Sequence, residues 1–340
     1  MVLGDCLDGK NNNVSFIKFI AAILVIFNHS FPLTGSGGDY ISRWTNGQTT
    51  FGGVAVYIFF FYSGFLIMKS MENKKTAKDF FKARLNRLLP QLWMVVIASV
   101  FLLGPIMTTL SISDYFKNID TYKYLINGLM IPIHELPGVF AGHKFDSTVN
   151  GSLWTLPVEF ACYILCFAIY KLNLNRTKSI SVIMAVSSIG YIVLYIVLFN
   201  IPMLRGTLIP CILYLMGMGC YLLRDNIRIK WYITVGLFAI LIIGIYLNLF
   251  FAFAVITIPY ILLHLGFATK IKLSRIGKVL DFSYGVYLVG WPVQQILCDL
   301  VPDITQFTNA TIAIAISIVL GYLLGMFDKL IKKSMSSSSK

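Results

Sequence analysis

Charged residues are scarce in this chain. Of its 340 residues, 13% are charged and 57% are hydrophobic, whereas soluble domains carry about 25% charged residues. A soluble core of this size still needs a polar surface, so the composition excludes a soluble globular enzyme and a disordered protein. What remains is an integral membrane protein with several spans.

The six cysteines form no disulfide framework. Five lie in apolar segments and Cys6 lies in a polar leader, while Cys162 and Cys166 are spaced one helical turn apart. We therefore expect small apolar fillers, no disulfide and no metal site, which excludes a secreted disulfide scaffold. The sequence also lacks an internal repeat, a Gly-rich phosphate loop and a Gly-x-Ser-x-Gly motif. Its start does not match a signal peptide.

Long apolar runs dominate the sequence. The strands of a membrane β-barrel alternate polar and apolar residues, whereas these runs are continuous, so the sequence predicts an all-α membrane helix bundle. A spanning helix needs about 20 apolar residues. We predict ten spans, at 16–33, 51–68, 88–107, 152–170, 179–199, 207–223, 231–248, 250–269, 282–300 and 309–327.

The net charge of +13 is unevenly distributed between the predicted spans. The connecting segments alternate between two sides, and one side carries 23 of the 28 Lys and Arg residues when Lys18 is included. That side comprises the N-terminus, 69–87, 171–178, 224–230, 270–281 and the chain from 328. By the positive-inside rule it is cytoplasmic, with both termini. The charge thus indicates topology, and we expect no nucleic-acid partner.

The spans predict one transmembrane domain, 16–328, preceded by a cytoplasmic leader, 1–15, and followed by a Ser-rich tail, 329–340, expected to be disordered. The long external segment 111–150 includes a short apolar stretch, Tyr124–Ile133, which predicts a re-entrant or interfacial piece. Among its titratable side chains are His134, Glu135, His143 and Asp146. Their spacing fits no metal-ligand pattern, and we interpret them as solvated loop residues.

Ionisable side chains inside spans are candidate functional residues, because placing them in lipid is costly. His29 lies in the outer part of the first predicted helix, and Lys18 lies eleven residues earlier. Eleven residues make about three turns, so the two side chains share a face, roughly 16.5 Å apart along the axis. The alternatives are that Lys18 snorkels to the interface and that His29 bonds a backbone carbonyl. His264 is a second buried candidate without a nearby acid in sequence.

Glu159 is the one carboxylate well inside an apolar run. Its helix enters from the outside, so Glu159 and His29 have comparable predicted depths. A carboxylate beside an imidazole would fix the tautomer and raise the basicity, as a general base requires. The alternative is a structural Glu bonded to Thr or Tyr hydroxyls.

Two further pairs lie at or inside predicted helices. Arg84 and Arg87 share a face at the cytoplasmic mouth of the third helix, where two guanidinium groups suit a phosphate-bearing ligand or simply anchor the helix. Ser63 and Gly64 interrupt an aromatic-rich helix. Small residues there either allow close helix packing or leave room for a ligand arm.

A late segment, Asp281–Gln295, opens the ninth predicted helix with Tyr and Gln side chains. These side chains either contact a polar substrate or lie at the membrane interface.

Together these segments resemble the acyltransferase 3 family of membrane O-acyltransferases, five of whose motifs occur in order over nearly the whole chain. The first motif, a basic residue separated by ten residues from a His, matches Lys18 and His29, and the aromatic Ser-Gly-Phe-Leu-Ile motif matches Phe60–Ile67. The motifs Arg-x-x-Arg and Pro-x-x-Trp match Arg84, Arg87, Pro90 and Trp93. The last two, Ser-Leu-Trp-Thr-Leu-x-x-Glu and Ser-Tyr-Gly-x-Tyr-Leu, match Ser152–Glu159 and Ser283–Leu288. Two departures are Lys18, where Arg is usual, and Gly290, where many members have His. A catalytic role for a late His is therefore unsupported. Many members also carry an extra esterase-like domain, which is not found here, so we expect a stand-alone member.

The resemblance implies an activity and a set of site residues. The activity is transfer of an acetyl group from cytoplasmic acetyl-CoA to a hydroxyl of a bacterial surface carbohydrate (O-antigen, capsule, exopolysaccharide or a lipid-linked glycan) in the inner or plasma membrane, without a permanently bound cofactor. The implied residues are His29 and Glu159 for catalysis, Lys18, Ser63, Arg84 and Arg87 for the donor, and Trp154, Tyr284, Tyr287 and Gln294 for the acceptor. General-base and acetyl-His mechanisms both stay open, as do a longer acyl donor and the oligomeric state.

Two other functions compete with acyl transfer. Buried His and Glu with basic mouths also suit a transporter or flippase, which often shows broken helices and internal repeats. A catalytically inactive member could scaffold glycan assembly, although the intact set of motif residues argues against it.

Overall fold

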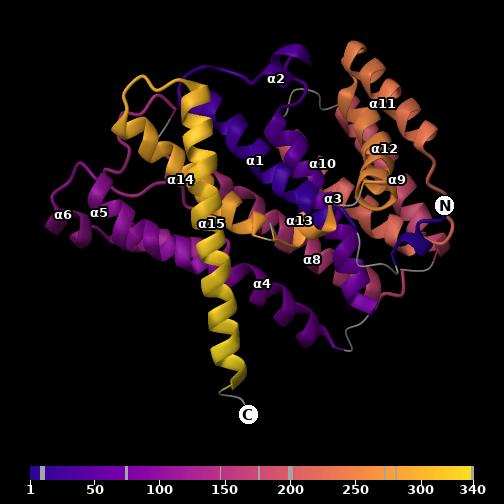
Figure 1. Ribbon diagram of the computed structural model, residues 1–340, viewed down its shortest axis with the longest axis horizontal. Helices are drawn as coiled ribbons and strands as arrows, with labels where there is room; N and C mark the ends of the chain where they lie inside the picture. The colour runs from indigo at the N-terminus through magenta and orange to yellow at the C-terminus, as the bar shows by residue number, and fades with distance from the viewer. Residues whose placement is uncertain are drawn as a thin grey trace. The chain divides into compact units, whose positions relative to one another are not determined.

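The computed structural model describes residues 1–7, 12–72, 76–145, 147–174, 177–197, 202–271, 273–279 and 282–337 (Figure 1). Within these ranges the chain forms helices, two isolated β-bridges and no strand, which confirms the predicted all-α class. The apolar runs form helices because backbone groups in lipid must be bonded within their own segment.

Among the described residues, six helical segments are long and apolar enough to cross a membrane. They are Val14–Leu33, Phe51–Met71, Ala77–Met107, Gly151–Lys171, Phe250–Ala268 and Gln306–Ser334. Each of the ten predicted spans coincides with helix in the described part of the chain. The count of ten spans and the cytoplasmic termini stay predictions.

The chain divides into two compact units. Unit 1 comprises Met1–Ala21, Tyr40–Phe80 and Val158–Asp281, and unit 2 comprises Ala22–Asp39, Phe81–Pro157 and Phe282–Lys340. Helix α1 (Val14–Leu33) is one continuous helix that contributes to both.

Unit 1 is built around helix α3 packed on helix α10. A Cβ atom at Gly64 would overlap the carbonyl oxygen of Tyr214, and one at Gly217 would overlap that of Phe61. Glycines therefore bring the two backbones together, which is the packing role considered for the Ser63–Gly64 pair. The elements of unit 1 are η1 (Gly4–Cys6), α2 (Tyr40–Trp44), α3 (Phe51–Glu72), most of α8 (Thr155–Lys171), α9 (Thr177–Val197), α10 (Pro202–Leu222), α11 (Trp231–Tyr246), α12 (Phe250–Leu263), the π-helix η5 (His264–Ala268) and α13 (Ser274–Val279).

The described part of the leader lies against the loop that follows α10. The amide of Leu3 donates to the carbonyl of Ile227 at 2.9 Å, and the amide of Ile229 donates to that of Met1 at 2.9 Å. Residues 8–11 of the leader lie outside the described residues.

Unit 2 contains the long external segment and the last two long helices. Helices α14 and α15 pack side by side (Figure 1), and a Cβ at Gly285 would lie 2.8 Å from the carbonyl oxygen of Gly321. The elements of unit 2 are most of α4 (Ala77–Ala98), the π-helix η2 (Ser99–Leu103), α5 (Gly104–Met107), α6 (Ile112–Lys117), α7 (Ile119–Lys123), η3 (Tyr124–Leu129), η4 (Gly151–Trp154), α14 (Ser283–Leu300) and α15 (Gln306–Ser337).

Helix α15 continues to Ser337. Helix therefore occupies most of the tail for which the Ser-rich composition predicts disorder, and residues 338–340 lie outside the described residues.

The apolar stretch of the external segment forms the short 3₁₀ helix η3, which ends at Met130 in the left-handed region with φ 61°. A Cβ at Gly128 would lie 2.5 Å from the indole of Trp93. Trp93 belongs to α4, well before the end of the apolar segment at Met107. The stretch thus folds back against a candidate span, as a re-entrant piece would.

Candidate active site

His29 lies in the unit 2 part of α1. Its ring meets the indole of Trp291 edge-on, with centroids 4.7 Å apart and an interplanar angle of 70°. The Nδ1 atom of His29 is buried and has no hydrogen-bond partner among the described residues. Buried polar atoms in folded proteins are nearly always bonded, so this nitrogen is suited to a group that the protein does not itself supply.

Trp291 is fixed by the end of the external segment. Its Nε1 donates to the carbonyl oxygen of Thr148 at 3.0 Å, and Gln295 Nε2 donates to the same oxygen at 2.9 Å. A Cβ at Gly151 would lie 2.7 Å from the indole, so only glycine leaves space for the ring there. These contacts orient the side chain that touches His29.

Helix α14 also lies close to α1. A Cβ at Gly290 would lie 2.6 Å from Cγ1 of Ile26. Gln294 Nε2 donates to the carbonyl of Ile26 at 2.8 Å and to Oδ1 of Asn309 at 2.9 Å. A larger side chain at position 290 would therefore require the Ile26 side chain to shift.

The predicted acceptor residues occupy structural positions in unit 2. The hydroxyl of Tyr287 donates to the carbonyl of Ser152 at 2.7 Å and lies 2.8 Å from Thr155 Oγ1, so it secures the η4 turn that carries Trp154. The hydroxyl of Tyr284 donates to the carbonyl of Leu88 on α4 at 3.3 Å. Tyr287 and Gln294 are buried, and acceptor contacts at these positions stay a prediction.

Glu159 lies in unit 1 on α8, where two hydroxyls meet one of its carboxylate oxygens. Ser63 Oγ donates to Oε1 at 3.0 Å, and the hydroxyl of Tyr163 donates to the same atom. The structure thus brings together the predicted donor residue Ser63 and the predicted catalytic Glu159. It also supports the structural alternative of a Glu held by hydroxyls. The pairing of Glu159 with His29, which belongs to unit 2, stays a prediction.

The predicted donor-side cations lie on α1 and α4. Lys18 is half-buried on α1, Arg84 is half-buried on α4, and Arg87 is exposed one turn later on α4. Helix geometry places Arg84 and Arg87 on one face, as predicted. Their binding of a phosphate group is untested.

Sequence reasoning missed three contributors. Trp291 lies in the late segment Asp281–Gln295, for which substrate contacts are predicted only through Tyr and Gln side chains; the aromatic residue before Pro292 is the available signal. Tyr163 lies one helical turn after Glu159, a spacing that could have indicated it. His143 was interpreted as solvated, which is wrong: its side chain is 11% exposed. Its ring nitrogens lie 2.9 Å from Gln295 Oε1 and 3.1 Å from Asp299 Oδ1.

An all-helical membrane bundle with an imidazole nitrogen available for a substrate is compatible with a membrane transferase, and the comparisons identify that class. Residues 11–326 match the model of the acyltransferase 3 family, described as an acyltransferase domain. The chain therefore belongs to this family and is an acyltransferase and an integral membrane protein.

Two curated relatives are similar to this chain. One is the "O-acetyl transferase" of Shigella phage Sf6, 29% identical over 85% of this chain and 86% of that protein. The other is "Nodulation protein 10" of Rhizobium leguminosarum bv. viciae, 25% identical over 54% of this chain and 50% of that protein. No solved structure matches.

Proposed function

We propose that this protein is an O-acetyltransferase of a bacterial inner or plasma membrane. It moves an acetyl group from cytoplasmic acetyl-CoA to a hydroxyl of a surface carbohydrate such as O-antigen, capsule or exopolysaccharide. The family supports acyl transfer, and the name of the phage relative supports the acetyl group and an oxygen acceptor. The basic segments on the predicted cytoplasmic side support a donor that arrives from there.

The observation that carries the proposal is the unpartnered Nδ1 of His29 beside Trp291. His29 acts as the general base: it accepts the proton of the acceptor hydroxyl as that oxygen attacks the thioester carbonyl. A carbon–oxygen bond forms, the carbon–sulfur bond breaks, and the CoA thiolate leaves and takes the proton from the imidazolium. In the covalent variant, His29 attacks the thioester first and carries the acetyl group to the hydroxyl.

Glu159 raises the basicity of the imidazole in this proposal, and the guanidinium groups of Arg84 and Arg87 hold the donor phosphates. Ser63 has two roles, because its hydroxyl lines the path of the thioester arm and orients Glu159 through the 3.0 Å bond. Lys18 adds positive charge on the donor side of α1.

The test is direct transfer by purified protein in lipid vesicles, with radiolabelled acetyl-CoA and chemically deacetylated surface polysaccharide from cells that carry this gene. Label is expected in the polysaccharide as an alkali-labile ester. Mass spectrometry of polysaccharide from cells with and without the gene is expected to differ by acetyl groups. Absence of label from the polysaccharide, with donor and acceptor both present, would overturn the proposal.

A further inference from the structure

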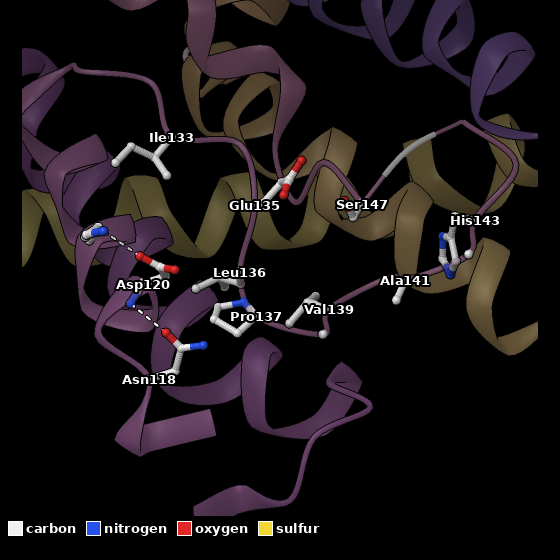
Figure 2. Close-up of a pocket in the computed structure, with 13 residues that line it drawn as sticks. Asn118, Asp120, Ile133, Glu135, Leu136, Pro137, Val139, Ala141, His143 and Ser147 are labelled. Atoms are coloured by element: carbon white, nitrogen blue, oxygen red, sulfur yellow. Dashed lines mark hydrogen bonds and ion pairs between the residues drawn. The ribbon is translucent and has the colours of Figure 1, made fainter. Parts of the chain in front are cut away.

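The 111–150 segment of unit 2 forms a cavity of about 620 Å³ that is open to solvent on one side (Figure 2). It lies among the start of α7, the loop after Ile133 and the turn that carries His143. This volume is in the range of small-molecule sites, about 300–1,000 Å³, and is large enough for a sugar residue. The cavity is formed by the segment between the third and fourth predicted spans, which lies on the predicted outer side.

The lining combines apolar and hydroxyl-accepting groups. Leu136 and Val139 supply apolar surface, and Asp120 and Glu135 supply carboxylates (Figure 2). A pyranose has the matching character, because its C–H face is apolar and its rim carries hydroxyl donors. Carboxylates are strong acceptors for such donors.

The two carboxylates differ in their partners. Asp120 Oδ1 lies 2.6 Å from the ammonium of Lys123, and the amide of Asp120 donates to Asn118 Oδ1 at 2.9 Å. Glu135 is exposed and has no ion-pair or hydrogen-bond partner among the described residues. The cavity therefore presents one uncompensated negative charge, which favours an uncharged ligand over an anionic one.

The cavity wall is joined to the helix that contacts His29. His143 lines the cavity and bonds Gln295 and Asp299 on α14. Lys144 Nζ lies 2.8 Å from Asp303 Oδ1 just beyond α14 and holds the pKa of that carboxyl below its usual 3.8. Ser147, also in the lining, precedes Thr148, whose carbonyl binds both Trp291 and Gln295.

We propose that this cavity is an acceptor subsite that binds an uncharged sugar residue next to the residue being acetylated. Hydroxyls of that sugar donate to Glu135 and Asp120, and its apolar face lies on Leu136 and Val139. The inference rests on the proposed function, since it needs a carbohydrate acceptor. It places acceptor recognition in the external segment, outside the set of motif residues.

The kinetic experiment compares Glu135→Gln and Asp120→Asn with Asp114→Asn, using purified protein and deacetylated polysaccharide from cells that carry the gene. Asp114 is an exposed acid of the same external segment that does not line the cavity. Replacing a carboxylate by an amide removes the charge but keeps an acceptor oxygen, so the weaker hydrogen bonds should raise the acceptor KM roughly fivefold in the cavity variants. The KM for acetyl-CoA and the kcat at saturating acceptor should stay within twofold, as should all constants of the control.

An acceptor KM unchanged by both cavity substitutions would overturn the subsite. If the wild-type protein transfers acetyl groups in the same assay, the proposed function is retained and only the subsite is rejected. If the wild-type protein transfers none, the proposed function itself is rejected. The second measurement is NMR of the native polysaccharide. It should show an uncharged residue adjacent to each acetylated one, and a uronic or other acidic sugar there would also overturn the subsite.

Discussion

The imidazole of His29 stands edge-on to the indole of Trp291 at 4.7 Å. His29 comes from the first long helix and Trp291 from α14, and the indole is held by Thr148 of the external segment. The proposed base is thus positioned by a residue whose own orientation depends on the 111–150 segment.

Replacing His29 with Ala should abolish acetyl transfer while the protein stays folded and inserted. A general base contributes about 10²–10⁴-fold to the rate, so kcat should fall by that factor. His134→Ala is the control, because it removes an exposed imidazole outside the candidate spans. Retention of more than about a tenth of wild-type activity by His29→Ala would contradict the catalytic assignment. Loss of inserted protein would instead indicate a structural histidine.

Gly151→Ala should destabilise the protein and slow transfer, because the new Cβ would lie 2.7 Å from the indole of Trp291. Overpacking of this kind costs about 1–3 kcal/mol, measurable as a lower midpoint of thermal unfolding in detergent. Gly236→Ala on α11 is the control, since its Cβ would meet no atom within 4 Å. An unchanged midpoint and kcat in Gly151→Ala would show that the ring adjusts without consequence for His29.

Glu159→Gln should reduce kcat less than His29→Ala if the carboxylate only orients and polarises the imidazole. The substitution is nearly isosteric, and the amide oxygen can still accept from Ser63 and Tyr163. Tyr163→Phe removes one of these donors and should cost about 1.5–3 kcal/mol of stability, the usual value for a hydrogen bond to a charged group. If Glu159→Gln lowers stability but leaves kcat unchanged, Glu159 is a structural residue.

Arg84→Ala and Arg87→Ala should each weaken donor binding. A charge-assisted contact to phosphate contributes about 1.5–3 kcal/mol, so the KM for acetyl-CoA should rise roughly ten- to hundredfold with the acceptor KM little changed. Lys82→Ala is the control, because Lys82 is an exposed cation on the same helix. An unaltered acetyl-CoA affinity in the double variant would leave membrane anchoring as the role of the pair.

The predicted topology can be tested with single cysteines in a cysteine-free background. Ser113→Cys in the external segment should react with a membrane-impermeant maleimide on intact cells. Ser334→Cys near the C-terminus should react only after permeabilisation. Labelling of both positions from the same side would contradict the predicted topology, in which the termini are cytoplasmic and the number of spans is even.

The sequence was sufficient for the elements of the fold and for part of the site. A long continuous apolar run in lipid must form a helix to bond its own backbone groups, so the helices were predictable from these runs. Glu159 was predictable as a candidate because it lies inside such a run. Contacts between distant segments were not predictable in the same way. Tyr163 was within reach from helical spacing alone, whereas the bonds of His143 to α14 join positions more than 150 residues apart. Loop composition indicated solvent exposure there, and tertiary bonds overrode it.

The contact between Gly290 and Ile26 has an evolutionary consequence. A Cβ at position 290 would lie 2.6 Å from the Ile26 side chain. A larger side chain at position 290 therefore requires a smaller one at position 26. Family members with His at the position of Gly290 should therefore carry a smaller residue at the position of Ile26, and the two columns of a family alignment should covary. A Gly290→His variant of this protein should regain stability when Ile26 is changed to Ala, so exchange of a late histidine between family members requires a paired substitution.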